Sequence, residues 1–519
     1  MSNDARLVEV HNLLIDFPNE QQALARALDL AARITETAAA APTLTTEETT
    51  TARTALARLA EIAAPPPDLF YDDPDLEEAD LPPPQLRQDF LHRIPAAQRL
   101  AASLIGLLSS ATDPSSRPEL ELRARLLVVF GRYDASTPGL GIPLASAADD
   151  LLPTLLGHPP SVRLPLARHV LTVSLPPYFK LHPKLNPATG RVLSRPLGGE
   201  GALNTWFESS EQDVTSWRRQ VGLAAVVNLV IEALQPGEIE DLWPFLLPPL
   251  LSYLDDFESA NKMRGVAILG TLLKRVDASL LRRTGVGKVF ERSLEACFSA
   301  LSDPNTPRLL AATHPIALQL VNLQYPPPRP SDPLAADEPR FEALCRLFTT
   351  SIVHAWEFKG QNVAIETVTA CALAPLVDAM GSATIRYLQI LMPHLTDLLV
   401  TTATAGGDGT WTVDTATMML AASRALVAVV RNARLRMRRW EGKIGVAVSQ
   451  CWIGMHESKT AQALQAGSQE GSAAIEELKE SLADLLRELE GVSDTPIATR
   501  LAPYAGLADL VSSLEIAAH

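Results

Sequence analysis

The chain has 519 residues, of which 45 are lysine or arginine and 60 are aspartate or glutamate, so its formal net charge is −15. This acidic balance argues against broad binding of a nucleic-acid backbone, which requires clustered cations. Hydrophobic residues make up 47% and aromatic residues 5% of the chain, a composition that excludes a collagen-like, mucin-like or wholly disordered protein.

The cysteine pattern and the N-terminus both indicate an intracellular protein. Successive cysteines are 48, 26 and 80 residues apart, so no pair has the close spacing of a structural zinc site, and we expect reduced, mostly buried thiols. The N-terminus carries Asp4 and Glu9 where a secretory signal would be apolar. The four cysteines are Cys297, Cys345, Cys371 and Cys451.

No apolar run reaches the roughly 20 residues that a transmembrane helix needs. The longest apolar run, residues 221–234, contains Asn228 and Glu232. We therefore expect a protein of the cytoplasm and nucleus that has no membrane partner.

The first 90 residues divide into two parts. Residues 1–35 predict N-terminal helices rich in alanine, leucine and arginine. Residues 36–90 contain a Thr/Glu tract, two Pro-Pro-Pro runs and many acidic side chains, which predicts a partly disordered linker with one short helix at about 51–63. The linker is either a solvated connection or an acidic docking segment.

Residues 91–200 predict an irregular helical region that ends in a long loop, residues 176–201. Loops of this length inside a compact domain are uncommon and are often functional. The loop is basic, with Glu200 as the opposing charge, and is either an exposed basic loop or a site for an acidic partner. Its cations are Lys180, Lys184, Arg191 and Arg195.

Residues 203–457 predict a series of helix pairs. In residues 261–276, for example, Val266, Leu269, Leu273 and Val276 recur at the spacing of one helical face. The turns inside the pairs lie near residues 255, 303, 360 and 407, which are 48, 57 and 47 residues apart.

This spacing is typical of HEAT-type repeats, in which each helix pair stacks on the next to cover apolar faces that it cannot cover alone. The fold expected is therefore all-α, an α-solenoid of HEAT-like helical repeats. A non-repetitive all-helical domain is the alternative.

The C-terminal residues 458–519 predict a polar linker followed by capping helices. Asp484 and Arg487 are placed to pair at i, i+3. An apolar stripe predicts a helix that either caps the repeats or docks in a groove of a partner. The stripe consists of Ile475, Leu478, Leu482, Leu485 and Leu489.

Catalytic and ligand-binding motifs are incomplete in this sequence. The segment Gly285-Val286-Gly287-Lys288 lacks the earlier glycine and the following Ser or Thr of a phosphate-binding loop. His456-Glu457 begins a zinc-protease motif, but Thr460 stands where the second histidine is required. We therefore expect no catalytic residues, no cofactor and no metal, and a protein that is not an enzyme.

One basic cluster stands out as a candidate interaction site. On a continuous helix, residues 431, 434 and 438 would share one face. Arginine and tryptophan often anchor interfaces, although a solvated face, pairing with acids of the same chain, and nucleic-acid contact remain alternatives. The cluster consists of Arg431, Arg434, Arg436, Arg438, Arg439, Trp440 and Lys443.

The stretch from Leu247 to Leu301 resembles the family of the second Tel-two-interacting protein. The resemblance is carried by Asp255-Asp256, by the segment from Lys262 to Leu273 with Gly265 and Gly270, by Arg283-Thr284-Gly285, and by the apolar helix that begins at Val286.

The resemblance implies a non-catalytic subunit of the TTT co-chaperone complex. Its partners would be Tel-two and the first Tel-two-interacting protein, with indirect links to the phosphatidylinositol-kinase-related kinases and the ninety-kilodalton heat-shock chaperone machinery. A different HEAT-type adaptor, such as a transport receptor or a phosphatase scaffold, is the alternative, and an enzyme site assembled from distant residues is a third hypothesis.

Overall fold

The structure is a computed structural model, and the residues that it describes are all-α. No β-strand occurs among these residues, in which Leu185 and Val192 form one isolated antiparallel bridge. The all-α prediction is therefore confirmed. The described residues are 7–10, 12–13, 44–70, 83–134, 137, 140, 148–156, 160–198, 217–327, 338–359, 362–404 and 410–516.

The chain divides into two compact units. Unit 1 comprises Met1–Phe257 and Arg264–Gly287, and unit 2 comprises Glu258–Met263 and Lys288–His519. Each unit is described by itself below.

The N-terminal part of unit 1 is built on helix α3 (Thr46–Ala63), which packs against α5 (Pro84–Ala111) and α6 (Arg117–Phe130). Thr45 and Glu48 form a capping box, in which the Thr45 backbone N–H donates to the Glu48 carboxylate at 2.7 Å. Leu56 and Leu59 of α3 are fully buried.

Two parts of the predicted linker, residues 36–90, are therefore helical. The short helix expected at about 51–63 begins earlier, at Thr46, because the Thr/Glu tract acts as a capping signal. Helix α5 begins at Pro84, inside the predicted linker. Residues 36–43 and 71–82, and most of the predicted N-terminal helices in 1–35, lie outside the described residues; of the latter, residues 7–10 and 12–13 are helical.

The remaining helices of unit 1 are short, with the exception of α11. In chain order they are α4 (Pro67–Phe70), η3 (Gly131–Tyr133), α7 (Ala148–Leu156), α8 (Pro160–His169), the π-helical turn η4 (Val170–Ser174), η5 (Trp217–Arg219), α10 (Leu223–Ala233), α11 (Pro236–Leu254) and α13 (Ala278–Thr284).

Helix α11 is joined to α12 (Ser259–Leu273) by a turn with a buried charge. Asp256 pairs with Arg218 at 2.7 Å, and the Asp256 side chain is completely buried. After the turn, Gly265 lies so close to α11 that a Cβ added there would be 2.5 Å from the Leu254 backbone nitrogen. This glycine lets the two helix backbones approach each other.

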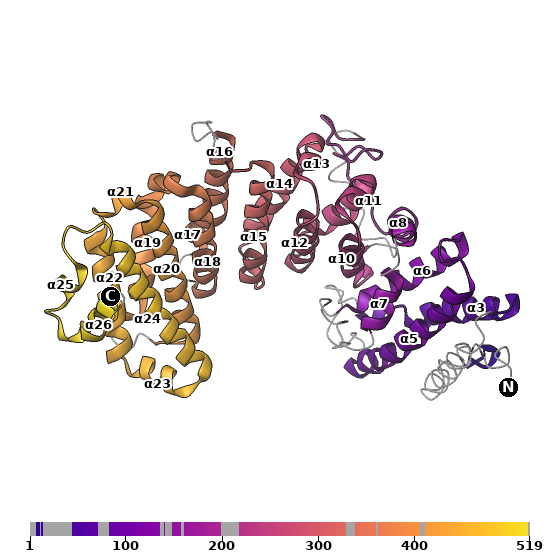
Figure 1. Ribbon diagram of the computed structural model, residues 1–519, viewed down its shortest axis with the longest axis horizontal. Coiled ribbons are helices and arrows are strands. Elements are labelled where there is room, and N and C mark those ends of the chain that lie inside the picture. Colours follow the sequence, from indigo (N-terminus) through magenta and orange to yellow (C-terminus); the bar gives the residue numbers. More distant parts are fainter. Residues whose placement is uncertain are drawn as a thin grey trace. The chain divides into compact units, whose positions relative to one another are not determined.

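Unit 2 continues the series of helix pairs that the sequence predicts. Its second helices lie side by side, with α15 packed on α18, α18 on α20, and α20 on α24 (Figure 1). This stacking is that of a HEAT-like α-solenoid, and the fold prediction is confirmed. The pairs are α14 (Gly287–Phe298) with α15 (Thr306–Gln324), α16–η6–α17 (Glu338–Leu347, Phe348–Val353, His354–Lys359) with α18 (Val363–Met380), α19 (Leu388–Thr404, after η7, Gly381–Tyr387) with α20 (Val413–Asn432), and α22 (Glu441–Glu457) with α24 (Gln469–Glu490).

The pair pattern extends past residue 457, where the sequence predicts that the repeats end. The apolar stripe of α24 is buried, and α24 contacts α20. Of the two roles predicted for this stripe, covering the repeats of its own chain is the one observed. The shorter elements of this region are α21 (Arg434–Met437), α23 (Lys459–Gly467), α25 (Ile497–Leu501), η8 (Ala505–Leu507) and α26 (Ala508–Ile516).

Two helical stretches of unit 2 are long and apolar enough to cross a membrane by length and composition alone. They are Val363–Thr401 and Val413–Asn432, whose apolar windows are 44% and 67% buried inside the protein. Both exceed the run at residues 221–234 that the sequence analysis singled out. Their apolar faces are used in packing of the helix pairs, as in core helices.

Candidate protein-interaction surfaces

The basic cluster lies at a corner between two helices, so the prediction that residues 431, 434 and 438 share one helical face is wrong. Helix α20 ends at Asn432, and Ala433 leaves the helical path with φ −116° and ψ 23°. Helix α21 and a turn follow before α22 begins at Glu441. Met437 is fully buried at this corner, so the polar side chains around it are turned outward.

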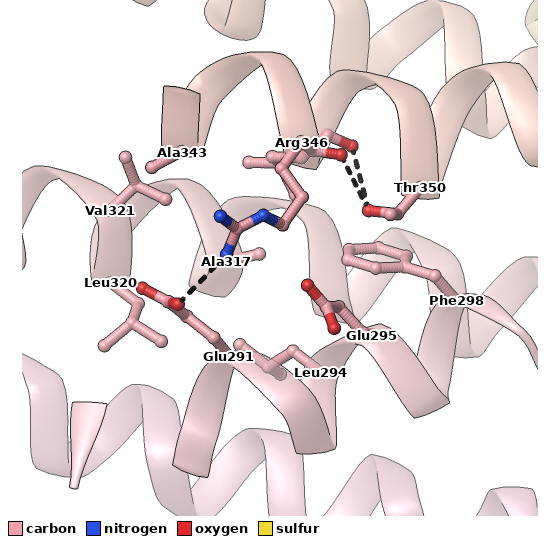
Figure 2. A pocket seen from close by; sticks show the side chains of 11 residues that line it. Glu291, Leu294, Glu295, Phe298, Ala317, Leu320, Val321, Ala343, Arg346 and Thr350 are labelled. Atoms are coloured by element: carbon pink, nitrogen blue, oxygen red, sulfur yellow. Dashed lines mark hydrogen bonds and ion pairs between the residues drawn. The ribbon is translucent and has the colours of Figure 1, made fainter. Parts of the chain in front are cut away.

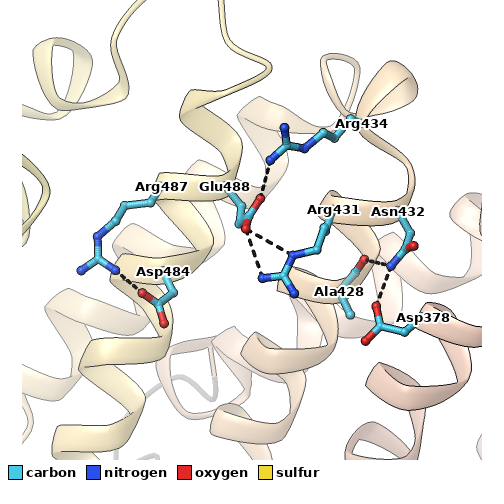
Figure 3. A network of polar contacts seen from close by, with 8 residues as sticks. All are labelled: Asp378, Ala428, Arg431, Asn432, Arg434, Asp484, Arg487 and Glu488. Atoms are coloured by element: carbon cyan, nitrogen blue, oxygen red, sulfur yellow. Dashed lines mark hydrogen bonds and ion pairs between the residues drawn. The ribbon is translucent and has the colours of Figure 1, made fainter. Parts of the chain in front are cut away.

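Two arginines of the cluster bind one carboxylate of α24 (Figure 3). Arg431 and Arg434 contact Glu488 at 3.1 Å and 2.8 Å. The hydrogen bond from Arg434, together with that from Arg431, lowers the pKa of Glu488. Beside them, the Asn432 side-chain amide donates to Asp378 of α18 at 2.7 Å. These contacts connect the corner to the helices on both sides of α20.

The rest of the cluster is only partly paired. Arg438 forms an ion pair with Asp494, and Lys443 lies 3.8 Å from Asp397. Trp440 is half-buried, and its carbonyl accepts the Ile444 N–H in the first turn of α22.

Arg436 and Arg439 are exposed, and neither forms an ion pair within the part of the chain that the structure describes. Leu435 beside them is 94% exposed, a feature that the sequence analysis did not identify. The available binding face at this corner is therefore Leu435, Arg436 and Arg439.

The long basic loop is described from residue 176 to residue 198 and is attached to unit 1 by its inner side. Phe179 stacks on Trp217 with ring centroids 6.2 Å apart, and the Val192 N–H donates to the Thr284 carbonyl at 3.0 Å. Gly190 has φ +62°, and a Cβ added there would lie 2.7 Å from a ring atom of Trp243. The predicted loop therefore has a defined conformation without helix or strand.

A groove of about 640 Å³ runs between α15 and α18 of unit 2. Its lining carries no charged side chain. Burial lowers the pKa of His314 to about 4, and burial raises the pKa of the Cys371 thiol, so both groups are neutral at neutral pH. The lining includes Ala311, His314, Pro315, Leu318, Asn322, Val368, Cys371 and Pro375.

A second pocket, between α14, α15 and α16, has a volume of about 30 Å³, which suits little more than a water molecule (Figure 2). Burial raises the pKa of Glu291, and the Gln324 amide donates to this carboxylate at 2.5 Å. Arg346 lies 3.9 Å from the same carboxylate. The pocket is too small for a substrate.

The incomplete motifs have structural roles. Gly285 ends α13 with φ +73°, and its N–H donates to the Leu281 carbonyl, so the Gly285–Lys288 segment is a helix C-cap. His456 contacts the Trp452 carbonyl at 2.9 Å. No group of three or more His, Cys, Asp or Glu side chains that could hold a metal ion occurs among the described residues.

Comparison with protein families decides what this solenoid is related to. The sequence profile of the Tti2 family, the family of Tel-two-interacting protein 2, matches residues 143–405, just over half of the chain. The chain belongs to the Tti2 family. The matched residues contain the stretch from Leu247 to Leu301 that carries the resemblance in the sequence, so that prediction is confirmed.

For the Tti2-family chain, a comparison with curated proteins finds no match. Two solved structures are similar to it. One is the crystal complex of SYS-1/POP-1, with 11% identity and a TM-score of 0.33 over 96% of this chain and 88% of that one. The other is a mutant of Kap121p, with 14% identity and a TM-score of 0.36 over 98% of this chain and 55% of that one.

The candidate surfaces differ in their relation to the Tti2 family. The matched residues include the long basic loop and the groove between α15 and α18, whereas the basic corner at residues 431–443 lies beyond them. Membership supports a role as a subunit of the TTT complex.

Proposed function

We propose that this chain is a non-catalytic scaffold subunit of a TTT-type co-chaperone complex. The observation that carries the proposal is the match to the Tti2 family over residues 143–405. A solenoid suits such a role because stacked helix pairs expose a large side-chain surface for binding other proteins. The neutral groups in the groove between α15 and α18 supply no acid, base or nucleophile for catalysis at neutral pH.

The proposed direct partners are Tel-two and the first Tel-two-interacting protein. Through them the chain would reach the phosphatidylinositol-kinase-related kinases and the ninety-kilodalton heat-shock chaperone machinery. The complex would support maturation and stability of these kinases, and hence the DNA-damage response and TOR signalling, in the cytoplasm and the nucleus.

Affinity purification of the full chain from its own cells tests the proposal. We expect two other large helical-repeat proteins in fixed stoichiometry, and lower kinase abundance when the chain is depleted. Recovery of the chain with a small GTPase or a phosphatase catalytic subunit would instead support the alternative HEAT-type adaptor. Imaging of the tagged chain tests its distribution between cytoplasm and nucleus.

The basic corner is the candidate partner surface that the sequence predicts. Reversing the charge of Arg434 and Arg438 should weaken partner binding, but these arginines already pair with Glu488 and Asp494, so the reversal also creates repulsion inside the chain. Arg436→Glu with Arg439→Glu is the cleaner test, because these side chains are exposed and form no ion pair with the described residues.

The matched control for this double variant is Arg99→Glu with Arg308→Glu, which changes the net charge equally at exposed positions elsewhere. We expect partner recovery to fall for the corner variant and to persist for the control, with unchanged melting curves. Equal recovery in both would show that the corner is ordinary solvated surface.

A further inference from the structure

The loop from residue 176 to residue 198 is a rigid platform. Phe179, His182 and Leu185 on its inner side are at most 5% exposed. The Leu193 N–H donates to the Lys184 carbonyl, and the Leu197 N–H donates to the Pro183 carbonyl, both at 2.8 Å. Because backbone contacts and buried side chains fix the loop, the side chains on its outer side are held in place before any partner arrives.

The outer side of this platform carries only positive charge. The sequence from 176 to 198 contains four cations and no aspartate or glutamate. Lys184, Arg191 and Arg195 form no ion pair with an acidic side chain among the described residues. Elsewhere in unit 1 cations are paired, as Arg163 is with Glu238 at 3.0 Å and Arg283 is with Glu240. In a chain with a net charge of −15, three cations without an acid form a distinct positive surface.

Aliphatic side chains are exposed among these cations. Leu181 is 56% exposed, Leu197 48% and Val192 38%. Exposed aliphatic side chains beside cations match a partner that offers both carboxylates and apolar side chains.

We infer that the outer face of loop 176–198 binds an acidic, leucine- or phenylalanine-containing segment of a partner protein. Charge complementarity selects the acidic segment, and the three aliphatic side chains select its apolar residues. A nucleic acid fits less well, because the rest of the chain repels a phosphate backbone and the loop face offers aliphatic side chains instead of stacking aromatic ones. The inference goes beyond the proposed function, since it names a surface and a partner chemistry whichever complex the chain joins.

The test is selection of a random library of peptides of about 12 residues on the full-length chain. We expect enrichment of peptides that combine several Asp or Glu residues with Leu or Phe. The binding of enriched peptides, labelled with a fluorophore, is then measured by polarisation. Enrichment without an acidic and apolar bias, or no enrichment, would overturn the inference.

The decisive variant is Lys184→Glu, Arg191→Glu and Arg195→Glu together, for which we expect at least about tenfold weaker binding of the enriched peptides. The matched control reverses three exposed arginines elsewhere, Arg99→Glu, Arg292→Glu and Arg308→Glu, which changes the net charge equally. Equal loss in both would mean a general charge effect and would contradict the inference. If the loop variant does not fold, replacement of the same three cations by glutamine takes its place.

The apolar part of the face is tested by Leu181→Ser with Leu197→Ser, which should weaken binding while all four cations remain. Vesicles of phosphatidylserine and phosphatidylcholine and a single-stranded RNA serve as competing probes. Tighter binding of either probe than of the peptides, lost in the loop variant, would assign the surface to a membrane or to RNA and overturn the inference. Neither result affects the co-purification test of the proposed function.

Discussion

Leu269 shows what one buried residue contributes to this solenoid. Its side chain is fully buried on α12, as the helical spacing predicts. Leu269→Asp would place an unpaired carboxylate there, at a cost of several kcal/mol, comparable to about half the stability of a typical domain. We expect the variant to lose its helical signal at a much lower temperature.

The control is Ala267→Asp, at an exposed position of the same helix. This substitution should leave the melting temperature nearly unchanged. If Leu269→Asp also melted normally, Leu269 would not belong to the core.

Two buried histidines make the stability of the chain depend on pH. Burial lowers the pKa of His182 and of His314 to about 4, against 6.5 for a free histidine. The unfolded chain therefore takes up protons between pH 6.5 and pH 4 while the folded chain does not. Each histidine should then remove up to about 3 kcal/mol of stability as the pH falls through this window.

Denaturant unfolding at several pH values measures this effect. Replacement of His314 by leucine should flatten the slope of stability against pH between 6.5 and 4, whatever it does to the absolute stability. An unchanged slope would mean that His314 is protonated in the folded chain.

At the scale of elements, the contact between α11 and α12 depends on Gly265. A Cβ at this position would meet the Leu254 backbone at 2.5 Å, and backbone atoms cannot move aside as a flexible side chain can. Gly265→Ala should therefore destabilise the chain by about 1–3 kcal/mol. Gly237→Ala on α11 has no atom within 4 Å and should be neutral or slightly stabilising. Thermal melting of both variants decides the question, and equal melting temperatures would contradict the prediction.

Charged side chains at the ends of elements show the limit of the sequence. The cluster from Arg431 to Lys443 is visible in the sequence, but the acids that pair with it, such as Glu488, are up to 57 residues away. Arg436 and Arg439 differ from Arg434 through these contacts alone.

At the scale of the whole molecule, each helix pair is stabilised by its neighbour. Ser423 of α20 and Ser481 of α24 are buried and hydrogen-bonded at 2.9 Å, so the last pair covers the one before it. Deletion of residues 458–519 would expose the apolar face of α20, and we expect a lower melting temperature and binding of a hydrophobic dye. Deletion of residues 491–519, which retains α24, should have a smaller effect. Equal behaviour of the two deletions would show that α24 does not cover the repeats.

The sequence by itself determined the helix pairs and their solenoid class, because the apolar residues that build them recur at the local spacing of one helical face. It also carried the family resemblance in the stretch from Leu247 to Leu301. It missed the packing of α3 and the last helix pair, where short polar tracts read as linkers.

Only the tertiary structure decided which charges remain available for binding. Lys184 and Arg191 remain without an acidic partner among the described residues, whereas Arg431 has one, and nothing in their local sequences distinguishes them. The physical reason is that burial of apolar residues along a helix follows from residues three or four positions apart, whereas pairing of a charge depends on side chains that only folding brings near.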